Sequence, residues 1–129
     1  MNTILVEISV GELLDKISIL EIKKEKIEDS TKLKFINNEY KMLKDQLDKN
    51  VKSDEKIDKL FQSLKEINAK LWIIENDKRL CEKNSDFSEK FIKLSRDVHF
   101  LNDDRGKIKL EINRHAGSKI KEIKKYTSY

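Results

Sequence analysis

Residues 87–116 read FSEKFIKLSRDVHFLNDDRGKIKLEINRHA, and their apolar side chains recur in one unbroken heptad register. That register predicts a single long helix with one apolar face. Residues 54–83 carry a second heptad pattern of similar length. Because only a short Asn-Ser-Asp turn separates the two stretches, we predict an antiparallel pair of long helices with 3-4 packing.

Two shorter helices are predicted upstream of this pair. Ser9 and Glu12 have the spacing of a capping box, which begins a helix that runs to about Glu28. The apolar side chains of this helix cover a wide surface, which indicates burial on two sides. Polar residues 29–31 then offer a new N-cap, and 3-4 spacing continues a second helix to about Asn50.

The whole chain of 129 residues has the length of one domain. We therefore predict an all-α protein over 1–129, built from two helical hairpins with the long antiparallel pair at about 54–83 and 87–116. Residues 3–10 alternate between apolar and other side chains, which predicts a short extended N-terminal segment. This segment either lies along a helix or pairs with its own copy in a dimer. Residues 118–129 form a basic C-terminal tail.

Composition excludes several classes of protein. Charged residues make up 40% of the chain, but the absence of proline and the presence of only 3 glycines argue against disorder. No apolar run approaches the roughly 18 residues that a membrane span needs, and the first residues lack the basic region of a signal peptide, so we expect a cytoplasmic protein. The single cysteine, Cys81, excludes a disulfide framework. His99 and His115 are too far apart to indicate a metal site, and we predict no metal and no cofactor.

The basic excess is concentrated at the end of the chain. Residues 1–106 have a net charge of −1, whereas residues 107–129 have a net charge of +5. Such a tail attracts phosphates, nucleic acid or an acidic partner, or else is only a solvated end. The near-neutral body and the scarcity of arginine in the tail argue against nucleic acid.

The clearest anomaly is Arg105, which interrupts the apolar stripe of the helix over 87–116. Polar side chains recur around it at 3-4 spacing, and such a stripe can line a groove and bind an anion, with the guanidinium as a bidentate clamp. The alternative is a structural salt bridge that fixes the helix register. The candidate anion ligands are Asn102, Arg105, Lys109 and Asn113. The carboxylates expected within reach of Arg105 are those of Glu21, Glu66 and Asp103.

Further polar candidates support this stripe but do not define a reaction. Their positions are Asp15, Lys16, Glu21, Lys23 and Glu75. Asp15 and Glu21 are six residues apart and do not share one helix face closely, which weakens a paired-carboxylate catalyst. Lys16 and Lys23 share a face, with a solvated helix edge as the simpler interpretation. The sequence leaves open whether the protein is an enzyme.

Residues 6–23 form the distinctive motif VEISVGELLDKISILEIK, and shorter motifs occur at 71–75, 102–105 and 117–126. Together they resemble a family of small bacterial proteins, a domain of unknown function whose members occur alone or near glycosyltransferases and tetratricopeptide proteins. The resemblance implies a setting in surface-polysaccharide biosynthesis and supplies no established catalytic residues.

Two functions follow as hypotheses. Elongated helices of this size leave apolar surface uncovered, which favours a homodimeric interaction or adaptor module with a larger biosynthetic enzyme as partner. The alternative is a small-anion or phosphosugar-binding protein, or an enzyme, that uses the polar stripe around Arg105.

Overall fold

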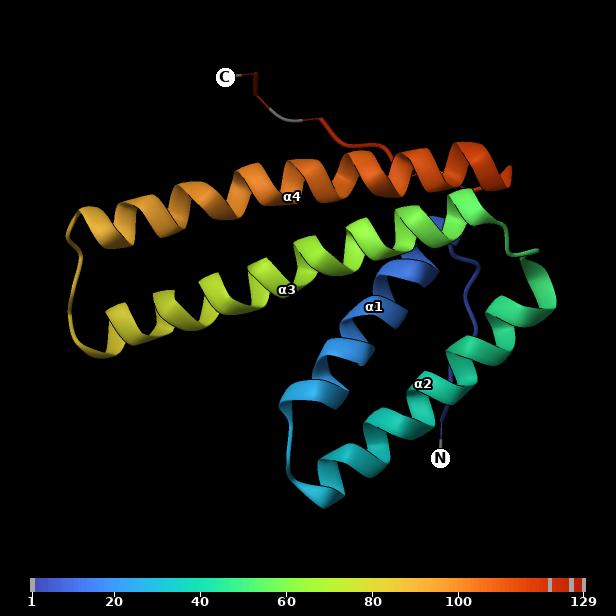
Figure 1. Cartoon of the computed structure of the whole chain (residues 1–129), viewed down its shortest axis with the longest axis horizontal. Coiled ribbons are helices and arrows are strands. Elements are labelled where there is room, and N and C mark those ends of the chain that lie inside the picture. The colour runs from blue at the N-terminus through green and yellow to red at the C-terminus, as the bar shows by residue number, and fades with distance from the viewer. Residues whose placement is uncertain (1, 121, 126, 129) are drawn as a thin grey trace.

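The computed structural model describes residues 2–120, 122–125 and 127–128, and these residues form four α-helices and no strand. The helices are α1 (Val10–Lys26), α2 (Ser30–Asn50), α3 (Glu55–Lys83) and α4 (Glu89–Ala116). Helices α3 and α4 form a long antiparallel pair, and α1 and α2 form a shorter hairpin that projects from one part of it (Figure 1). The predicted all-α architecture of two helical hairpins is confirmed.

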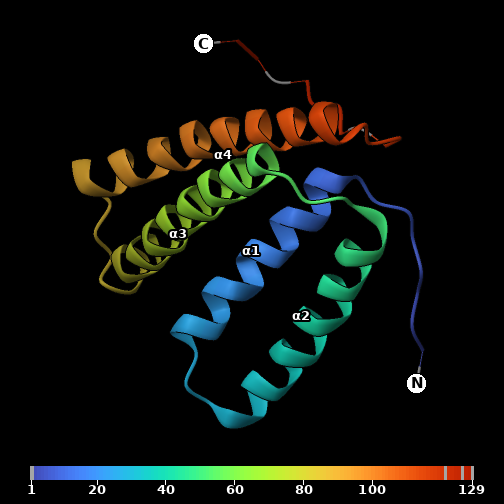
Figure 2. The same cartoon turned by 45° about the vertical axis from the view of Figure 1, so that its right-hand side comes forward.

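Helix α1 has more buried residues than any other helix, because α2, α3 and α4 all pack against it. Figure 2 shows α1 lying between α2 and the long pair. Its buried side chains are mostly aliphatic but include the polar Asp15 and Ser18. The wide apolar surface predicted contacts on two sides, and the fold supplies partners from three helices.

Side-chain oxygens cap the first three helices. Ser9 Oγ accepts a hydrogen bond from the Glu12 backbone N–H at 3.1 Å, which is the predicted half of the capping box. The Glu12 carboxylate, expected to return this bond to Ser9, instead accepts from Lys109 Nζ at 2.7 Å. Asp29 and Asp54 cap α2 and α3 in the same way as Ser9 caps α1. Each cap satisfies an N–H group that lacks a partner within its helix.

The turn between α3 and α4 differs from the prediction. Asp86 and Glu89 have the spacing of a capping box, but the N-cap of α4 is Ser88, whose side chain makes no capping bond, and the helix begins at Glu89 rather than at 87. Asp86 Oδ1 accepts instead from the Ser88 backbone N–H at 3.1 Å, which stabilises the turn itself. At the other end of α4, Gly117 is the C-cap and takes the left-handed conformation with φ +65°, which glycine adopts without steric cost.

The hydrophobic core lies where α1 packs across the long pair. Leu14 of α1, Leu64 of α3 and Ile112 of α4 contact one another there and are at most 2% exposed. We call this region, formed by α1 with residues 55–69 and 102–116, the crossing. We call the rest of the long pair, residues 70–101, the arm.

The arm extends beyond α1 and α2 and consists of two helices and their turn (Figure 1). Leu71 and Cys81 are its buried apolar residues. Several large apolar side chains of the arm are between 40% and 55% exposed: Ile73, Leu80, Phe87, Ile92 and Phe100. The two regions of the long pair therefore differ sharply in how much of their apolar surface is covered.

The segments outside the helices are largely exposed. Residues 2–8 form no helix, and Ile4, Leu5 and Val6 are at least 72% exposed, so this segment does not pack along a helix. In the C-terminal segment, Ile123 is 92% exposed and does not dock on the body. The two tyrosines of the tail, Tyr126 and Tyr129, lie outside the described residues.

Candidate functional site

An ion pair between α1 and α4 lies inside the crossing. Arg105 donates from Nε to Asp15 Oδ1 at 3.0 Å and from a terminal guanidinium nitrogen to Asp15 Oδ2, which is a bidentate arrangement. Asp15 is only 1% exposed. Asn68 of α3 donates from Nδ2 to Asp15 Oδ1 and to Ser18 Oγ, each at 2.8 Å. Groups from three helices therefore meet at one buried carboxylate.

The protonation state of this pair follows from its surroundings. Burial alone would raise the pKa of the Asp15 carboxyl. The hydrogen bonds from Arg105 and Asn68, with the positive charges of Arg105 and Lys109, outweigh burial and hold the pKa of Asp15 below its ordinary value. The hydrogen bond to Asp15 raises the pKa of Arg105 in turn. The pair therefore stays ionised at neutral pH, which suits a fixed structural contact better than proton transfer.

Lys109 of α4 is the second cation of the crossing, and it is buried, whereas Arg105 is half-buried. Its Nζ lies 2.7 Å from the Glu12 carboxylate, 3.0 Å from that of Glu122 and 3.6 Å from that of Asp15. Burial would lower the pKa of Lys109, but the hydrogen bonds to Glu12 and Glu122 and the nearby negative charges raise it above its ordinary value. Since Glu122 lies beyond the end of α4, this ammonium joins the C-terminal segment to α1.

The backbones of α1 and α4 approach closely at Gly11. The Gly11 N–H donates to Asn113 Oδ1 at 2.7 Å, and the Val10 N–H donates to Ser118 Oγ at 3.2 Å. A Cβ atom at Gly11 would lie 2.6 Å from the Lys109 carbonyl oxygen, which is too close for any real contact. Glycine is therefore required here, and side chains near the end of α4 satisfy two N–H groups in the first turn of α1.

The polar stripe predicted on α4 lies at the crossing, and α1 contributes Asp15 to it. Asn102 Oδ1 accepts from Arg105 NH1 at 3.3 Å, and Lys109 and Asn113 contact α1 as described. Arg105 pairs with Asp15, a partner that the sequence reasoning did not name. The geometry therefore engages most of the guanidinium with carboxylate and amide oxygens of the chain itself.

The other supporting candidates do not join this cluster. Glu21 accepts from Lys65 Nζ at 3.1 Å and from the Tyr40 hydroxyl at 3.3 Å, which connects α1 with α3 and α2. Lys16 is exposed and lies 3.7 Å from the Glu12 carboxylate, Lys23 is half-buried in the last turn of α1, and Glu75 is exposed on the arm.

Sequence reasoning missed four contributors, namely Glu12, Ser18, Asn68 and Glu122. Folding the long hairpin about residue 85 places Asn68 near Asn102, so the register held a signal for Asn68. Glu12 was assigned only to its capping role. No periodicity connects Glu122 to Lys109, because Glu122 lies outside any helix.

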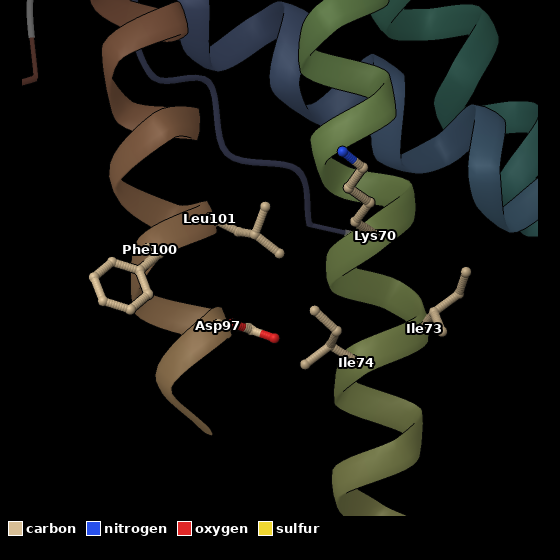
Figure 3. Close-up of a pocket in the computed structure, with 6 residues that line it drawn as sticks. All are labelled: Lys70, Ile73, Ile74, Asp97, Phe100 and Leu101. Atoms are coloured by element: carbon tan, nitrogen blue, oxygen red, sulfur yellow. The ribbon is translucent and has the colours of Figure 1, made fainter. Parts of the chain in front are cut away.

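Two hollows lie on the described surface. One, of about 250 Å³, lies between α4 and the C-terminal segment. The other, of about 370 Å³, is a groove of the arm between α3 and α4. Figure 3 shows Asp97 and Leu101 of α4 facing Ile74 of α3 across this groove. The first hollow is lined by Asn102, Asp103, Gly106, Lys107, Lys109, Leu110, Asn113, Glu122 and Lys124. The groove is lined by Lys70, Ile73, Ile74, Asp97, Phe100 and Leu101.

Two kinds of site are absent from the part of the chain that the structure describes. It contains no group of three His, Cys, Asp or Glu side chains placed to hold a metal ion. No helix within it has the length and apolar character needed to cross a membrane.

These features define an all-α protein in which two helical hairpins are joined by a partly buried network of ion pairs. The chain belongs to the family of unknown function DUF6165, whose model matches residues 4–129. No curated protein and no solved structure matches the chain.

Proposed function

We propose that this chain is an interaction module that pairs with a second copy of itself through the groove of the arm. The observation that carries the proposal is an apolar groove left open to solvent. Ile73 and Phe100, which line it, are 53% and 40% exposed. Monomeric proteins rarely leave large contiguous apolar patches uncovered, and such patches mark interaction sites.

The charges of the groove favour a second copy as the occupant. Lys70 and Asp97 lie at opposite ends of the groove, because α3 and α4 are antiparallel (Figure 3). A two-fold axis that passes through the middle of the groove at right angles to the line from Lys70 to Asp97 brings Lys70 of each copy toward Asp97 of the other. An isologous contact requires such self-complementarity.

A cytoplasmic location and a larger biosynthetic enzyme as a further partner belong to the same proposal. They are supported by the resemblance of residues 6–23 to proteins found near glycosyltransferases. With the groove occupied by the second copy, such an enzyme would contact other exposed surface of the dimer.

Sedimentation equilibrium of the full chain tests the pairing. We expect a dimer in the wild type and a shift to monomer in Ile73→Glu, because the new carboxylate would be buried without a partner. Leu80→Glu is the matched control, since Leu80 is 54% exposed on the same arm but does not line the groove. A wild-type chain that stays monomeric at about 100 μM, a concentration at which standard-size interfaces are saturated, contradicts the proposal.

Charge reversal tests the orientation of the two copies. Lys70→Glu and Asp97→Lys each place like charges opposite one another and should weaken the dimer. The double variant restores opposite charges and should recover most of the lost affinity. If the double variant is weaker than either single variant, the two-fold arrangement is wrong.

A further inference from the structure

We infer that the hollow beneath the C-terminal segment binds a small phosphate-bearing ligand, and that Glu122 occupies the ligand's place in the unliganded chain. This inference is independent of the pairing through the arm, since none of the groove residues lines this hollow.

The first support is the size and lining of the hollow. Its volume of about 250 Å³ is below the usual range for drug-sized ligands, which favours a compact one. Lys107, Lys109 and Lys124 line it with the amide side chains of Asn102 and Asn113. Ammonium groups bind phosphate as point charges, and amide side chains add hydrogen bonds.

The second support is that the structure holds the three carboxylates near Lys109 with different firmness. Glu12 and Asp15 belong to α1, and Asp15 is already held by Arg105 and Asn68. Glu122 is 43% exposed at its side chain and lies on a segment without regular secondary structure. Of the three carboxylates, Glu122 is therefore the one that another anion replaces at the smallest cost in free energy.

The third support is the charge balance of the region. The set counted here consists of the charged groups that line the hollow together with Glu12, Asp15 and Arg105. Its four carboxylates are those of Glu12, Asp15, Asp103 and Glu122, and its four cations are Arg105, Lys107, Lys109 and Lys124. The net charge of this set is zero. Withdrawal of Glu122 leaves a net charge of +1 beside a buried ammonium. A phosphate monoester carries more negative charge than the carboxylate that it replaces, so it competes well for this position.

The apparent affinity for phosphate then depends on the fraction of molecules in which Glu122 has withdrawn. Glu122→Gln removes the competitor, and we expect it to tighten phosphate binding at least about threefold relative to the wild type. Glu39→Gln is the matched control, because it makes the same charge change at an exposed position of α2, outside the hollow. It should bind phosphate as the wild type does.

Titration with inorganic phosphate, followed by backbone amide shifts in NMR at low ionic strength, measures this effect. The shifts should map to residues 102–113 and to the described part of 118–125, and sodium chloride of equal ionic strength should not reproduce them. Adding Lys107→Gln to Glu122→Gln should weaken the binding at least about twofold by removing a lining cation. Equal phosphate affinity in Glu122→Gln and Glu39→Gln, or shifts confined to other regions, would overturn the inference.

Discussion

The crossing and the arm are built from the same two helices but are held together differently. In the crossing, α1 covers the long pair, and a buried carboxylate, a guanidinium and an amide bond to one another among the core side chains. In the arm, α3 and α4 pack against each other without a third helix over them, and large apolar side chains such as Ile73 and Leu80 stay half-exposed. The seam of the arm still buries Leu71 and Cys81, so the third helix decides whether the apolar side chains beside the seam are covered or stay at the surface.

The polar groups of the crossing also fix the position of α1 on the long pair, which burial of apolar surface alone does not do. A purely apolar crossing would tolerate sliding of α1 along the long pair, whereas the bonds of Asp15 to Asn68 and Arg105 hold a single position. Buried polar groups often select one arrangement in this way. The arm carries no such constraint on its outer surface, which leaves that surface available for a partner.

The largest expected effect comes from breaking the polar centre of the crossing. Asp15→Ala leaves Arg105 without its carboxylate and Asn68 without an acceptor, so we expect the free energy of unfolding to fall by about 3 to 5 kcal/mol. Urea unfolding measures this loss. Asp104→Ala, at an exposed position on α4, is the control and should change the value by less than about 0.5 kcal/mol. Similar losses of stability in the two variants would contradict the role assigned to Asp15.

The next effect tests the close approach of α1 and α4. Gly11→Ala places a Cβ atom against backbone and should destabilise the protein by about 2 kcal/mol. Gly106→Ala is the matched control and should stabilise the protein. Its Cβ would meet only the Lys124 side chain, at 3.7 Å, and alanine is favoured over glycine in a helix by about 0.5 to 1 kcal/mol. Thermal unfolding should move in opposite directions in the two variants. The contact is misassigned if both shift the same way.

The pH dependence of stability sharpens the assignment of the charged centre. Because the pKa of Asp15 is lower in the folded chain, its contribution is complete above the unfolded value of about 3.9 and is lost as the pH falls through the folded value. The stability gap between the wild type and Asp15→Asn should therefore be constant near neutral pH and narrow progressively as the pH falls below about 3.9. Other acidic groups are common to both chains and cancel in the comparison. A gap that also stays constant at acid pH would show that the carboxylate charge is not responsible.

The smallest effect is expected on the arm. Leu80 is 54% exposed, so Leu80→Ala should change the free energy of unfolding by less than about 0.5 kcal/mol. Urea unfolding at low protein concentration checks this value. A loss above about 1.5 kcal/mol, typical of a buried aliphatic side chain, would mean that this side of the arm is covered in solution.

Periodicity and caps predicted the helices well, because each depends on residues close together in the sequence. The heptad register predicted a helix over 87–116, and α4 starts two residues later, at Glu89, because Asp86 and Ser88 bond within the turn. Arg105 was singled out as an anomaly, but its partner depends on how α1 packs across the long pair. Packing between distant segments leaves no periodic trace, which is why the roles of Gly11 and Glu122 also had to come from the structure.

The bond from the Val10 N–H to Ser118 joins residues 108 positions apart, and the bond from Gly11 to Asn113 joins residues 102 apart. During synthesis, the two N–H groups of the first helix can therefore reach these partners only after residues 113–118 have emerged. Such long-range closure slows folding relative to helical proteins whose contacts are local. A chain that ends before residue 105 would lack the guanidinium that pairs with Asp15, so its first helix could not bury that carboxylate as an ion pair.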